Sequence, residues 1–275
     1  MIITIASGKG GTGKTTVASS LSLLIPHSVY MDTDVEEPNG HLLLHPQISE
    51  IEECLFPVPF IDENICTFCG LCAKHCAFHA LTILKEQKKV MYFPELCRSC
   101  GACSYVCPVK GALKEVPKQK GVIRRGKAFF KENEIDFMDG IMNIGEPSPT
   151  PIIRKLKNLI DKNSITIVDA PPGTACPVIE SIEMADFVIL VTEPTPFGIN
   201  DLKLAIEVVK QLKKDFGVVI NKDKGKIAKE LSSLPILLKI PFKRQFAYLY
   251  SQGKVLIEDK EGEGLFLSLK KRLGI

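Results

Sequence analysis

A group of four cysteines occurs twice along this chain of 275 residues, and the repeat restricts the possible folds more than any other feature. The second group follows the first at a constant displacement of 31 residues, and the members are Cys66, Cys69, Cys72 and Cys76, then Cys97, Cys100, Cys103 and Cys107. Eight of the ten cysteines therefore lie in one short segment, which in a reducing compartment indicates metal or redox chemistry rather than disulfides. Because a repeat is one structural unit used twice, we expect two equivalent half-domains.

The spacing within each group has the form C-x₂-C-x₂-C-x₃-C, and Pro108 follows the second group. This is the bacterial ferredoxin run, in which the fourth cysteine ligates the other cluster. The two expected [4Fe–4S] ligand sets are Cys66, Cys69, Cys72 and Cys107, and Cys97, Cys100, Cys103 and Cys76. The segment thus resembles a complete two-cluster ferredoxin, although Ala77 replaces the usual proline after the first group. Structural zinc is the alternative, but zinc sites do not require thiolates so closely spaced.

A second motif, Gly8 to Thr15, has the form G-x-x-x-x-G-K-[ST]. It lies between an apolar, β-branched run at 1–6 and an expected helix at 14–24, which is the context that a phosphate-binding loop requires. Glycines allow successive backbone N–H groups and the helix N-terminus to face phosphate oxygens. We expect Lys14 to reach the β- and γ-phosphates and the Thr15 hydroxyl to ligate Mg²⁺. A glycine-rich turn without a ligand is the alternative.

Strands and helices alternate outside the cysteine-rich segment. The expected strands lie near 28–31, 165–169, 187–191, 216–220 and 236–240, and the expected helices at 152–162, 177–184 and 199–214, with two more helices at the C-terminus. This alternation predicts a mostly parallel sheet covered on both faces. The predicted fold class is therefore α/β, a doubly wound P-loop domain formed by 1–57 and 119–275. The segment 58–118 is predicted to be an inserted, small α+β ferredoxin-like domain, followed by a strand or hairpin at 121–130 and a rigid loop at 145–151.

Lys9 adds a second lysine to the loop, and Lys9 to Thr15 resembles the deviant Walker A motif of the MinD/ParA/Mrp/nitrogenase-iron-protein class. Asp32-Thr33-Asp34 resembles the acidic element after the second strand of this class, and Asp169-Ala-Pro-Pro-Gly-Thr174 resembles its Walker B and second switch. Asn221-Lys222 and Ile240-Pro241-Phe242 match the places where the class holds adenine. The resemblance implies a SIMIBI-type fold and an ATP-dependent homodimer, in which Lys9 reaches the phosphates bound by the partner.

The resemblance also assigns roles to individual residues. The expected nucleotide-binding residues are Gly8, Lys9, Gly10, Gly11, Thr12, Gly13, Lys14, Thr15, Thr16, Asp32, Gly173, Asn221, Lys222 and Pro241. Lys9, Lys14, Asp34 and Asp169 are the expected catalytic residues. Asp169 is expected beside Mg²⁺ through a water, and Asp34 is placed to orient the attacking water. Asp32 could do either job or cap a turn, and Gly173 is the expected pivot of a loop that senses the γ-phosphate.

Two cysteines lie outside the repeat. Cys54 is expected to be a small core or surface residue. Cys176 lies seven residues after Asp169, where the nitrogenase iron protein has a cluster-ligating cysteine, so the resemblance implies that Cys176 from two subunits could meet near the dimer axis. The alternative is a half-buried cysteine without a ligand role.

Two further segments have two interpretations each. The basic residues Lys118, Lys120, Arg124, Arg125, Lys127 and Lys131 form either a solvated hairpin face or a docking surface for an acidic redox partner. The C-terminal stretch 265–273 has leucines on one helical face, which suits a closing helix packed on the sheet. The same pattern resembles the membrane-targeting helix of MinD, so membrane binding is unfavoured but open.

Composition limits the remaining function classes. A net charge of +3 is too small to favour nucleic acid, and no run of about 18 apolar residues or signal peptide is present, so we expect a cytoplasmic protein. The expected cofactors are ATP, Mg²⁺ and two [4Fe–4S] clusters. The leading hypothesis is an ATPase whose nucleotide-dependent homodimer is coupled to electron transfer with an unidentified redox or iron–sulfur client. Alternatives are an Mrp-type cluster carrier or assembly ATPase, and a MinD-like positioning ATPase with structural or sensory clusters.

Overall fold

A computed structural model of the chain describes residues 1–225, 229–231 and 233–275, and it divides into two compact units. The first contains 1–52, 123–141 and 152–275, and the second contains 53–122 and 142–151. The boundaries expected from composition were 57/58 and 118/119. They differ because two long strands, β3 (Gln47–Ile61) and β6 (Leu113–Phe130), run through the boundaries without a change in secondary structure.

The segment 142–151 includes the rigid loop expected at 145–151 of the P-loop domain, but it groups with the cysteine-rich unit. Its Glu146 forms ion pairs with Lys118 at 2.8 Å and Lys120 at 3.3 Å. The Asn143 N–H also donates to the Lys120 carbonyl at 2.9 Å. These contacts join the segment to the second unit.

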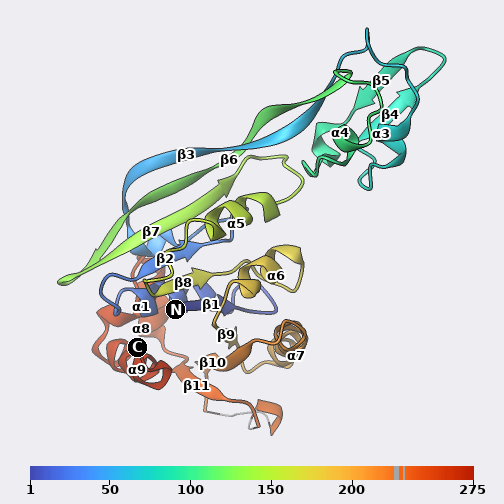
Figure 1. The fold of residues 1–275 in the computed structure, drawn as a ribbon. Helices are drawn as coiled ribbons and strands as arrows, with labels where there is room; N and C mark the ends of the chain where they lie inside the picture. Colours follow the sequence, from blue (N-terminus) through green and yellow to red (C-terminus); the bar gives the residue numbers. More distant parts are fainter. Residues whose placement is uncertain (226–228, 232) are drawn as a thin grey trace. The chain divides into compact units, whose positions relative to one another are not determined.

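A nine-stranded sheet of order β11-β10-β9-β1-β8-β2-β7-β6-β3 organises the first unit (Figure 1). The strands not yet given are β1 (Ile2–Ala6), β2 (Val29–Asp32), β7 (Asn133–Met142), β8 (Thr166–Asp169), β9 (Phe187–Thr192), β10 (Asp215–Asp223) and β11 (Ile236–Pro241). The neighbouring strands from β11 to β7 are all paired parallel. This arrangement confirms the predicted, mostly parallel α/β class.

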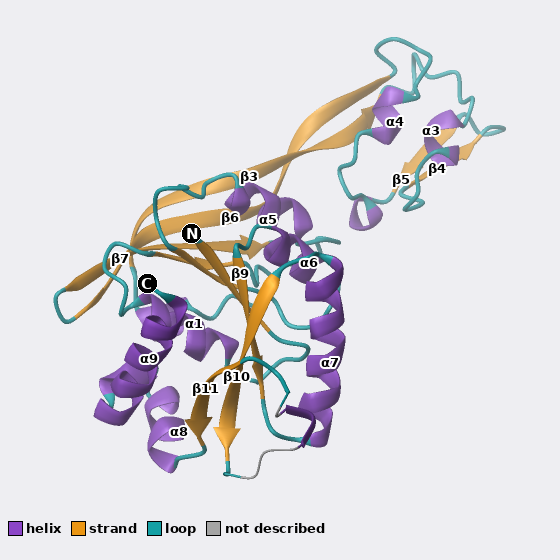
Figure 2. Ribbon diagram, turned by 60° about the horizontal axis from the view of Figure 1, so that its bottom comes forward, coloured by secondary structure: helices purple, strands orange, loops and turns teal. Residues whose placement is uncertain are grey.

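Helices cover both faces of this sheet, as Figure 2 shows for α6 and α7 on one side and α8 and α9 on the other. The helices are α1 (Lys14–Ser22), α2 (His41–Leu44), α5 (Thr150–Lys157), α6 (Cys176–Glu183), α7 (Pro196–Gln211), α8 (Arg244–Ser251) and α9 (Lys260–Leu273), with 3₁₀ turns at Lys229–Leu231 and Leu256–Glu258. Val188 and Leu190 of β9 pack in the core with α6 and α7, whereas Ile189 and Val191 pack in the core with α1 and α9. This alternation explains why the parallel strands are apolar without interruption.

Strand β3 was not predicted, and β6 and β7 form a longer hairpin than the expected 121–130. The sequence of β3 includes several glutamates and two prolines, and the strand lies at the sheet edge, where charged residues and proline are tolerated. Gly126 of β6 allows close approach here, because a Cβ at this position would lie 2.2 Å from the Gln47 carbonyl oxygen.

The second unit repeats its backbone conformation as well as its cysteines. Its elements are α3 (Leu71–Lys74), β4 (Leu81–Leu84), β5 (Lys89–Tyr92), a 3₁₀ turn at Pro94–Leu96 and α4 (Ala102–Tyr105), and β4 pairs antiparallel with β5. Phe68 and Ser99, 31 residues apart, both have positive φ, at 53° and 54°. Gly70 and Gly101 share φ values of 84° and 75° and directly precede α3 and α4. The two half-domains are therefore equivalent in backbone as well as in sequence.

Candidate functional site: a phosphate loop and two cysteine cavities

The loop between β1 and α1 depends on glycine at three positions. Gly11 and Gly13 have φ values of 75° and 94°, which side chains rarely adopt. A Cβ on Gly13 would also lie 2.2 Å from Asn221 Nδ2, and one on Gly8 would lie 2.1 Å from the Asp201 carbonyl oxygen of α7. The sequence therefore folds here into a tight loop whose backbone faces its surroundings without intervening side chains.

A cavity of about 450 Å³ opens beside this loop. It brings together ten of the expected site residues, which are Gly10, Gly11, Gly13, Lys14, Thr15, Thr16, Asp34, Asn221, Lys222 and Pro241. Lys14 is only 7% exposed at the first turn of α1, and Thr12 Oγ1 is buried without a hydrogen bond to any described residue. A buried cation and a buried hydroxyl without a partner are what an anionic ligand would satisfy.

The other expected site residues lie around the cavity rather than on its lining. Gly8 packs against α7, and the Lys9 carbonyl accepts a hydrogen bond from the Ser7 hydroxyl at 2.6 Å. The Gly173 N–H donates to the Ser7 carbonyl at 3.0 Å, and Gly173 has a φ of 98°. Gly173 thus holds the loop after β8 against the phosphate loop in a conformation that suits glycine.

Asp169 lies at the end of β8, fully buried. Its Oδ2 accepts a hydrogen bond from the Tyr30 hydroxyl at 3.0 Å. Its Oδ1 is buried, and no contact with the described residues meets the usual distance and angle criteria for a hydrogen bond to this atom. Burial raises the pKa of Asp169, and Lys14, the nearby Thr15 hydroxyl and the Tyr30 hydroxyl oppose that rise. The carboxylate of Asp169 and the hydroxyl of Thr15 therefore lie together, and this pair of oxygen donors fits the chemistry of a hydrated Mg²⁺ ion.

Asp32 has a different environment from Asp169 although the two are register partners on β2 and β8. Its oxygens accept hydrogen bonds from the N–H groups of Asp34 at 3.0 Å, Asn39 at 3.2 Å and Gly40 at 3.0 Å. Burial and the charge of Asp169 raise the pKa of Asp32, and these backbone donors oppose the rise. The geometry favours the interpretation in which Asp32 caps the turn after β2.

Asp34 lines the cavity and is partly buried. Burial raises the pKa of Asp34 from 3.8 to about 6, with Lys14 lowering it and Asp169 raising it. A carboxylate with this pKa beside a phosphate cavity can accept a hydrogen bond from water near neutral pH.

The cavity lining combines residues that the sequence indicated, Asn221, Lys222 and Phe242, with two that it did not, Phe246 and Tyr250. Asn221 Nδ2 donates to the Thr12 carbonyl at 2.8 Å, and Lys222 Nζ donates to the Gly11 carbonyl at 3.2 Å, so both expected residues brace the loop. Phe242, Phe246 and Tyr250 add an aromatic wall. The spacing of four between the last two, on one face of α8, is the signal that could have found them.

A third buried acid also escaped prediction. Asp139 of β7 is the register partner of Asp32, and Arg124 of β6 donates to both of its oxygens, from Nε at 2.9 Å and from a terminal nitrogen at 2.5 Å. The recurrence of an aromatic residue, Met and Asp in Tyr30-Met31-Asp32 and Phe137-Met138-Asp139 is the sequence signal. The two aromatic rings stack at 5.7 Å.

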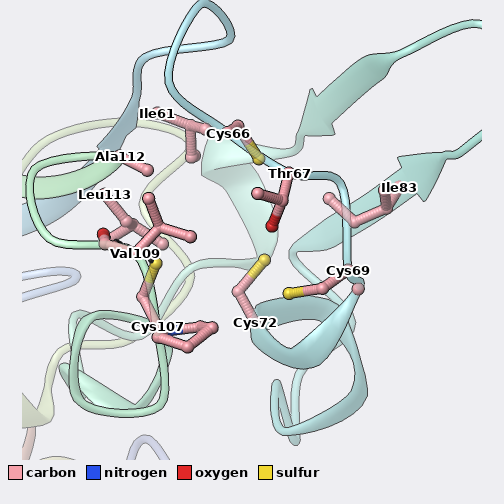
Figure 3. A pocket seen from close by; sticks show the side chains of 12 residues that line it. Ile61, Cys66, Thr67, Cys69, Cys72, Ile83, Cys107, Val109, Ala112 and Leu113 are labelled. Carbon is pink, nitrogen blue, oxygen red and sulfur yellow. Dashed lines mark hydrogen bonds between the residues drawn. The ribbon is translucent and has the colours of Figure 1, made fainter.

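The first cysteine cavity of the second unit collects the first expected ligand set. Its lining includes Cys66, Cys69, Cys72 and Cys107, whose sulfur atoms lie around one space in Figure 3. The Phe68 N–H donates to Cys66 Sγ at 3.3 Å. Four thiols from one short loop, one short helix and a distant segment fit the donor set of an iron–sulfur cluster.

The second cysteine cavity collects the other set, Cys76, Cys97, Cys100 and Cys103. The Ala80 N–H donates to Cys76 Sγ at 3.2 Å. In each cavity the fourth cysteine comes from the other half of the repeat, as the ferredoxin run requires. The structure therefore brings together both expected sets.

The remaining cysteines are separate from these cavities. Cys54 is fully buried in the second unit, as a core residue. Cys176 is exposed at the first residue of α6 and does not line the phosphate cavity.

The basic residues of β6 and its flanks are paired within their own units. The ion pairs are Lys118 and Lys120 with Glu146, Arg124 with Asp139, Arg125 with Glu50 and Glu52, Lys127 with Glu134, and Lys131 with Glu263. This pairing favours the interpretation without a docking role for the stretch.

The C-terminal helix α9 packs as a closing helix. Phe266 and Leu269 are fully buried in the core, with Leu265 and Leu273 packed against it, and Lys270 Nζ donates to the Leu24 carbonyl at 2.9 Å. Among the described residues, no helix combines the length and the apolar character needed to span a membrane.

Comparisons with known proteins agree with the presence of a phosphate loop and of two groups of cysteines. A model of the 4Fe-4S dicluster domain matches residues 65–111. The uncharacterized protein MJ0579 of Methanocaldococcus jannaschii is 30% identical over 268 residues, covering 94% of this chain and 92% of that protein. The uncharacterized ATP-binding protein MJ0169 of the same organism is 23% identical, covering 100% of this chain and 80% of that protein.

The fold also matches solved structures. The septum site-determining protein MinD of Pyrococcus horikoshii, complexed with Mg-ADP, superimposes with a TM-score of 0.61 and 18% identity, covering 99% of this chain and 95% of that one. This likeness confirms the predicted fold of the first unit, and the dicluster match confirms the inserted ferredoxin domain. The chain therefore belongs to the same family as MJ0579, and it combines a MinD-like P-loop fold with an inserted 4Fe–4S dicluster domain.

Proposed function

We propose that this protein hydrolyses Mg²⁺-ATP as a nucleotide-dependent homodimer and couples that cycle to electron transfer through two [4Fe–4S] clusters. The observation that carries the coupling is the continuity of β6. One strand includes Leu113, which lines the first cysteine cavity, and Arg124, which is paired with Asp139 beside Asp32. Asp32 is in turn the register partner of Asp169 at the nucleotide cavity.

The nucleotide roles follow from the charges at the phosphate loop. Lys14 would neutralise the β- and γ-phosphates, and Thr15 with Asp169 would hold Mg²⁺, directly and through a water. The Asp169 carboxylate, which is buried and lies beside the Thr15 hydroxyl, supports that assignment. Bound Mg²⁺ supplies charge neutralisation of the phosphates, and Asp34 orients the water that attacks the γ-phosphate.

Dimerisation depends on Lys9 in this proposal. The Lys9 side chain is half-buried, and its ammonium has no ion-pair or hydrogen-bond partner among the described residues. A lysine without a partner in its own subunit is available to the γ-phosphate bound by a second copy, where it would add positive charge as an arginine finger does.

The cysteine cavities supply the redox half of the proposal. Cys66, Cys69, Cys72 and Cys107 would hold one cluster, and Cys97, Cys100, Cys103 and Cys76 the other. Each bound cluster supplies one-electron redox chemistry. The strand β6 contributes residues to both units, and we propose it as the segment through which a change at one site biases the other.

Sedimentation velocity tests the dimer directly. The hydrolysis-impaired variant Asp34→Ala should sediment as a dimer with ATP and as a monomer with ADP. The double variant Lys9→Ala/Asp34→Ala should remain monomeric with ATP while still binding the nucleotide. A monomer in ATP for the single variant, with ATP shown to be bound, overturns the dimer proposal.

A further inference from the structure

The two cysteine cavities have unequal surroundings although their ligands repeat. We propose that Lys120, Tyr92 and Ser99 give the cluster of the second cavity the higher reduction potential. The first electron taken from a one-electron donor then resides at the second cavity. The inference rests on the proposed function in one respect, namely that both cavities hold a [4Fe–4S] cluster.

Comparison of equivalent positions reveals the asymmetry. Tyr92 occupies the position that Ile61 has in the first half, and Ser99 the position of Phe68. Lys120 is equivalent to Lys89, which is exposed, whereas Lys120 is only 3% exposed. The second half therefore has a polar side chain at two positions where the first half has an apolar one, and a buried lysine where the first half has an exposed one.

The first cavity is lined by apolar groups. Besides its cysteines, the lining consists of Ile61, Thr67, Gly70, Ile83, Pro108, Val109, Ala112 and Leu113, most of which Figure 3 shows around the sulfur atoms. None of these carries a charge, and Thr67 alone contributes a hydroxyl. Low polarity around a cluster disfavours its more highly charged, reduced state.

Two buried hydroxyls lie near the second cavity, and that of Tyr92 interacts with the Cys97 side chain. Ser99 lies on the cavity lining. For Ser99 Oγ and for the Tyr92 hydroxyl, no contact with the described residues meets the usual distance and angle criteria for a hydrogen bond. Tyr92 and Cys76 both pack against the small core that includes Cys97, and burial together with the Cys97 side chain raises the pKa of Tyr92. Buried hydroxyls require acceptors, and cluster sulfur atoms are the acceptors that the ligand set would bring there.

Lys120 contributes a positive charge at the same place. Its Nζ donates to the Cys97 carbonyl at 3.0 Å and lies 3.3 Å from Glu146 Oε2. Lys118 lies 2.8 Å from the other oxygen of the same carboxylate. Two lysines thus share one glutamate, which leaves a net positive charge beside the Cys97 segment.

Other groups near the cavities do not cancel this difference. Arg98 and Glu115 both line the second cavity and have opposite charges. The two N–H donors to cysteine sulfur, from Phe68 to Cys66 and from Ala80 to Cys76, have similar lengths and serve one cavity each. Lys85 lies beside Gly70 of the first cavity, but it is exposed, so solvent screens its charge. The remaining difference among buried groups is the ammonium of Lys120 and the two hydroxyls.

The redox step is a one-electron reduction. A donor such as dithionite loses one electron, the cluster of the second cavity gains it, and the total charge of that site becomes one unit more negative. Lys120 and the two hydroxyls stabilise this added charge, so the reduced state is favoured there over the first cavity.

Anaerobic dithionite titration of the reconstituted full chain, followed by EPR, tests the inference. The wild type should be reduced in two separate one-electron steps. Lys120→Met should move the higher-potential step to lower potential and leave the other step in place. Lys118→Met is the matched control, because it also removes a lysine from Glu146, and it should move neither step comparably. Tyr92→Phe should move the same step as Lys120→Met, by less.

Cysteine variants assign each reduction step to a cavity, and the iron content separates a failure of this inference from a failure of the proposed function. Cys100→Ser should alter the EPR signal of the higher-potential step, and the equivalent Cys69→Ser that of the lower. A content well below about eight iron atoms per chain in the wild type removes the cluster premise of the proposed function. Full iron content with a single step, or with equal shifts of both steps in Lys120→Met, overturns the inference alone. Tyr92→Phe decides the matter where Lys120→Met fails to fold.

Discussion

Asp32 and Asp169 are register partners on β2 and β8 and are both buried, yet their hydrogen bonding separates them. Three backbone N–H groups donate to Asp32, whereas the carboxylate of Asp169 accepts from the Tyr30 hydroxyl and lies beside the Thr15 hydroxyl of the phosphate loop. One carboxylate is therefore engaged in holding a turn, and the other lies at the phosphate loop.

Substitution should separate these two roles. Asp32→Ala leaves three backbone donors without an acceptor and should lower the free energy of unfolding by about 1–3 kcal/mol. Asp169→Asn keeps the Tyr30 contact and removes a desolvated charge, so it should cost little stability but weaken Mg²⁺-ATP binding. Thermal unfolding and nucleotide titration measure the two effects. Equal losses of stability in both variants would refute the division of roles.

Protonation of Asp34 should lower the ATPase activity at acid pH. Because burial raises the pKa of Asp34 to about 6, protonation below that pH removes the carboxylate that orients water, and kcat/KM for ATP should fall with a midpoint near pH 6. The stability effect has the opposite sign. The folded state binds the proton more tightly than the unfolded chain, so this group's contribution to the free energy of unfolding decreases as pH rises from 3.8 to about 6.

The control for this pH dependence is Asp34→Asn, which cannot titrate. Its free energy of unfolding should change less between pH 4 and pH 6 than that of the wild type. An ATPase profile of the wild type that stays flat down to pH 5, where the fold is intact, would rule out Asp34 as the titrating group.

Arg124 should matter more for stability than its exposed neighbour on β6. Arg124→Met leaves the fully buried Asp139 without its bidentate partner, which costs about 3–5 kcal/mol for a broken buried pair. Lys127→Met removes an exposed pair with Glu134, which solvent screens, and should change the free energy of unfolding far less. Denaturant unfolding of the two variants measures the difference, and equal midpoints would contradict the importance of the Arg124–Asp139 pair.

The closing role of α9 is testable with neighbouring residues. Phe266→Ala empties a fully buried position and should destabilise the protein by about 3–5 kcal/mol, whereas Leu267, which is 49% exposed, should tolerate alanine within about 0.5 kcal/mol. Equal and small effects, accompanied by loss of vesicle binding in both variants, would instead support a membrane-targeting helix.

The parts predicted correctly from the sequence were those that local chemistry determines. The loop from Gly8 to Thr15 has a motif, a preceding apolar strand and a following helix, and the structure has β1 and α1 in those places. The parallel sheet followed from apolar strands that alternate with helices. The grouping of the cysteines followed from a spacing in which the fourth member comes from the other half, and the two groups line separate cavities, whereas their role as ligands stays a prediction.

Features that depend on distant partners were missed. The edge strand β3 has little alternation and contains prolines, so its identity depends on pairing with β6 rather than on its own residues. Asp139 acquires its role through register with Asp32, and the aromatic wall of Phe246 and Tyr250 forms when α8 packs beside the loop. Tertiary contacts of this kind leave weak local signals.

The central claim is that the nucleotide and redox sites are coupled. Anaerobic reductive titration followed by EPR, without nucleotide, with ADP and with a slowly hydrolysed ATP analogue, tests it most directly, with Lys14→Ala as the control. The proposal predicts a reduction potential or spectrum that changes with the nucleotide in the wild type and does not change in Lys14→Ala, which retains its clusters. Identical titrations of the wild type in all three conditions, with the nucleotides shown to be bound, would contradict the coupling.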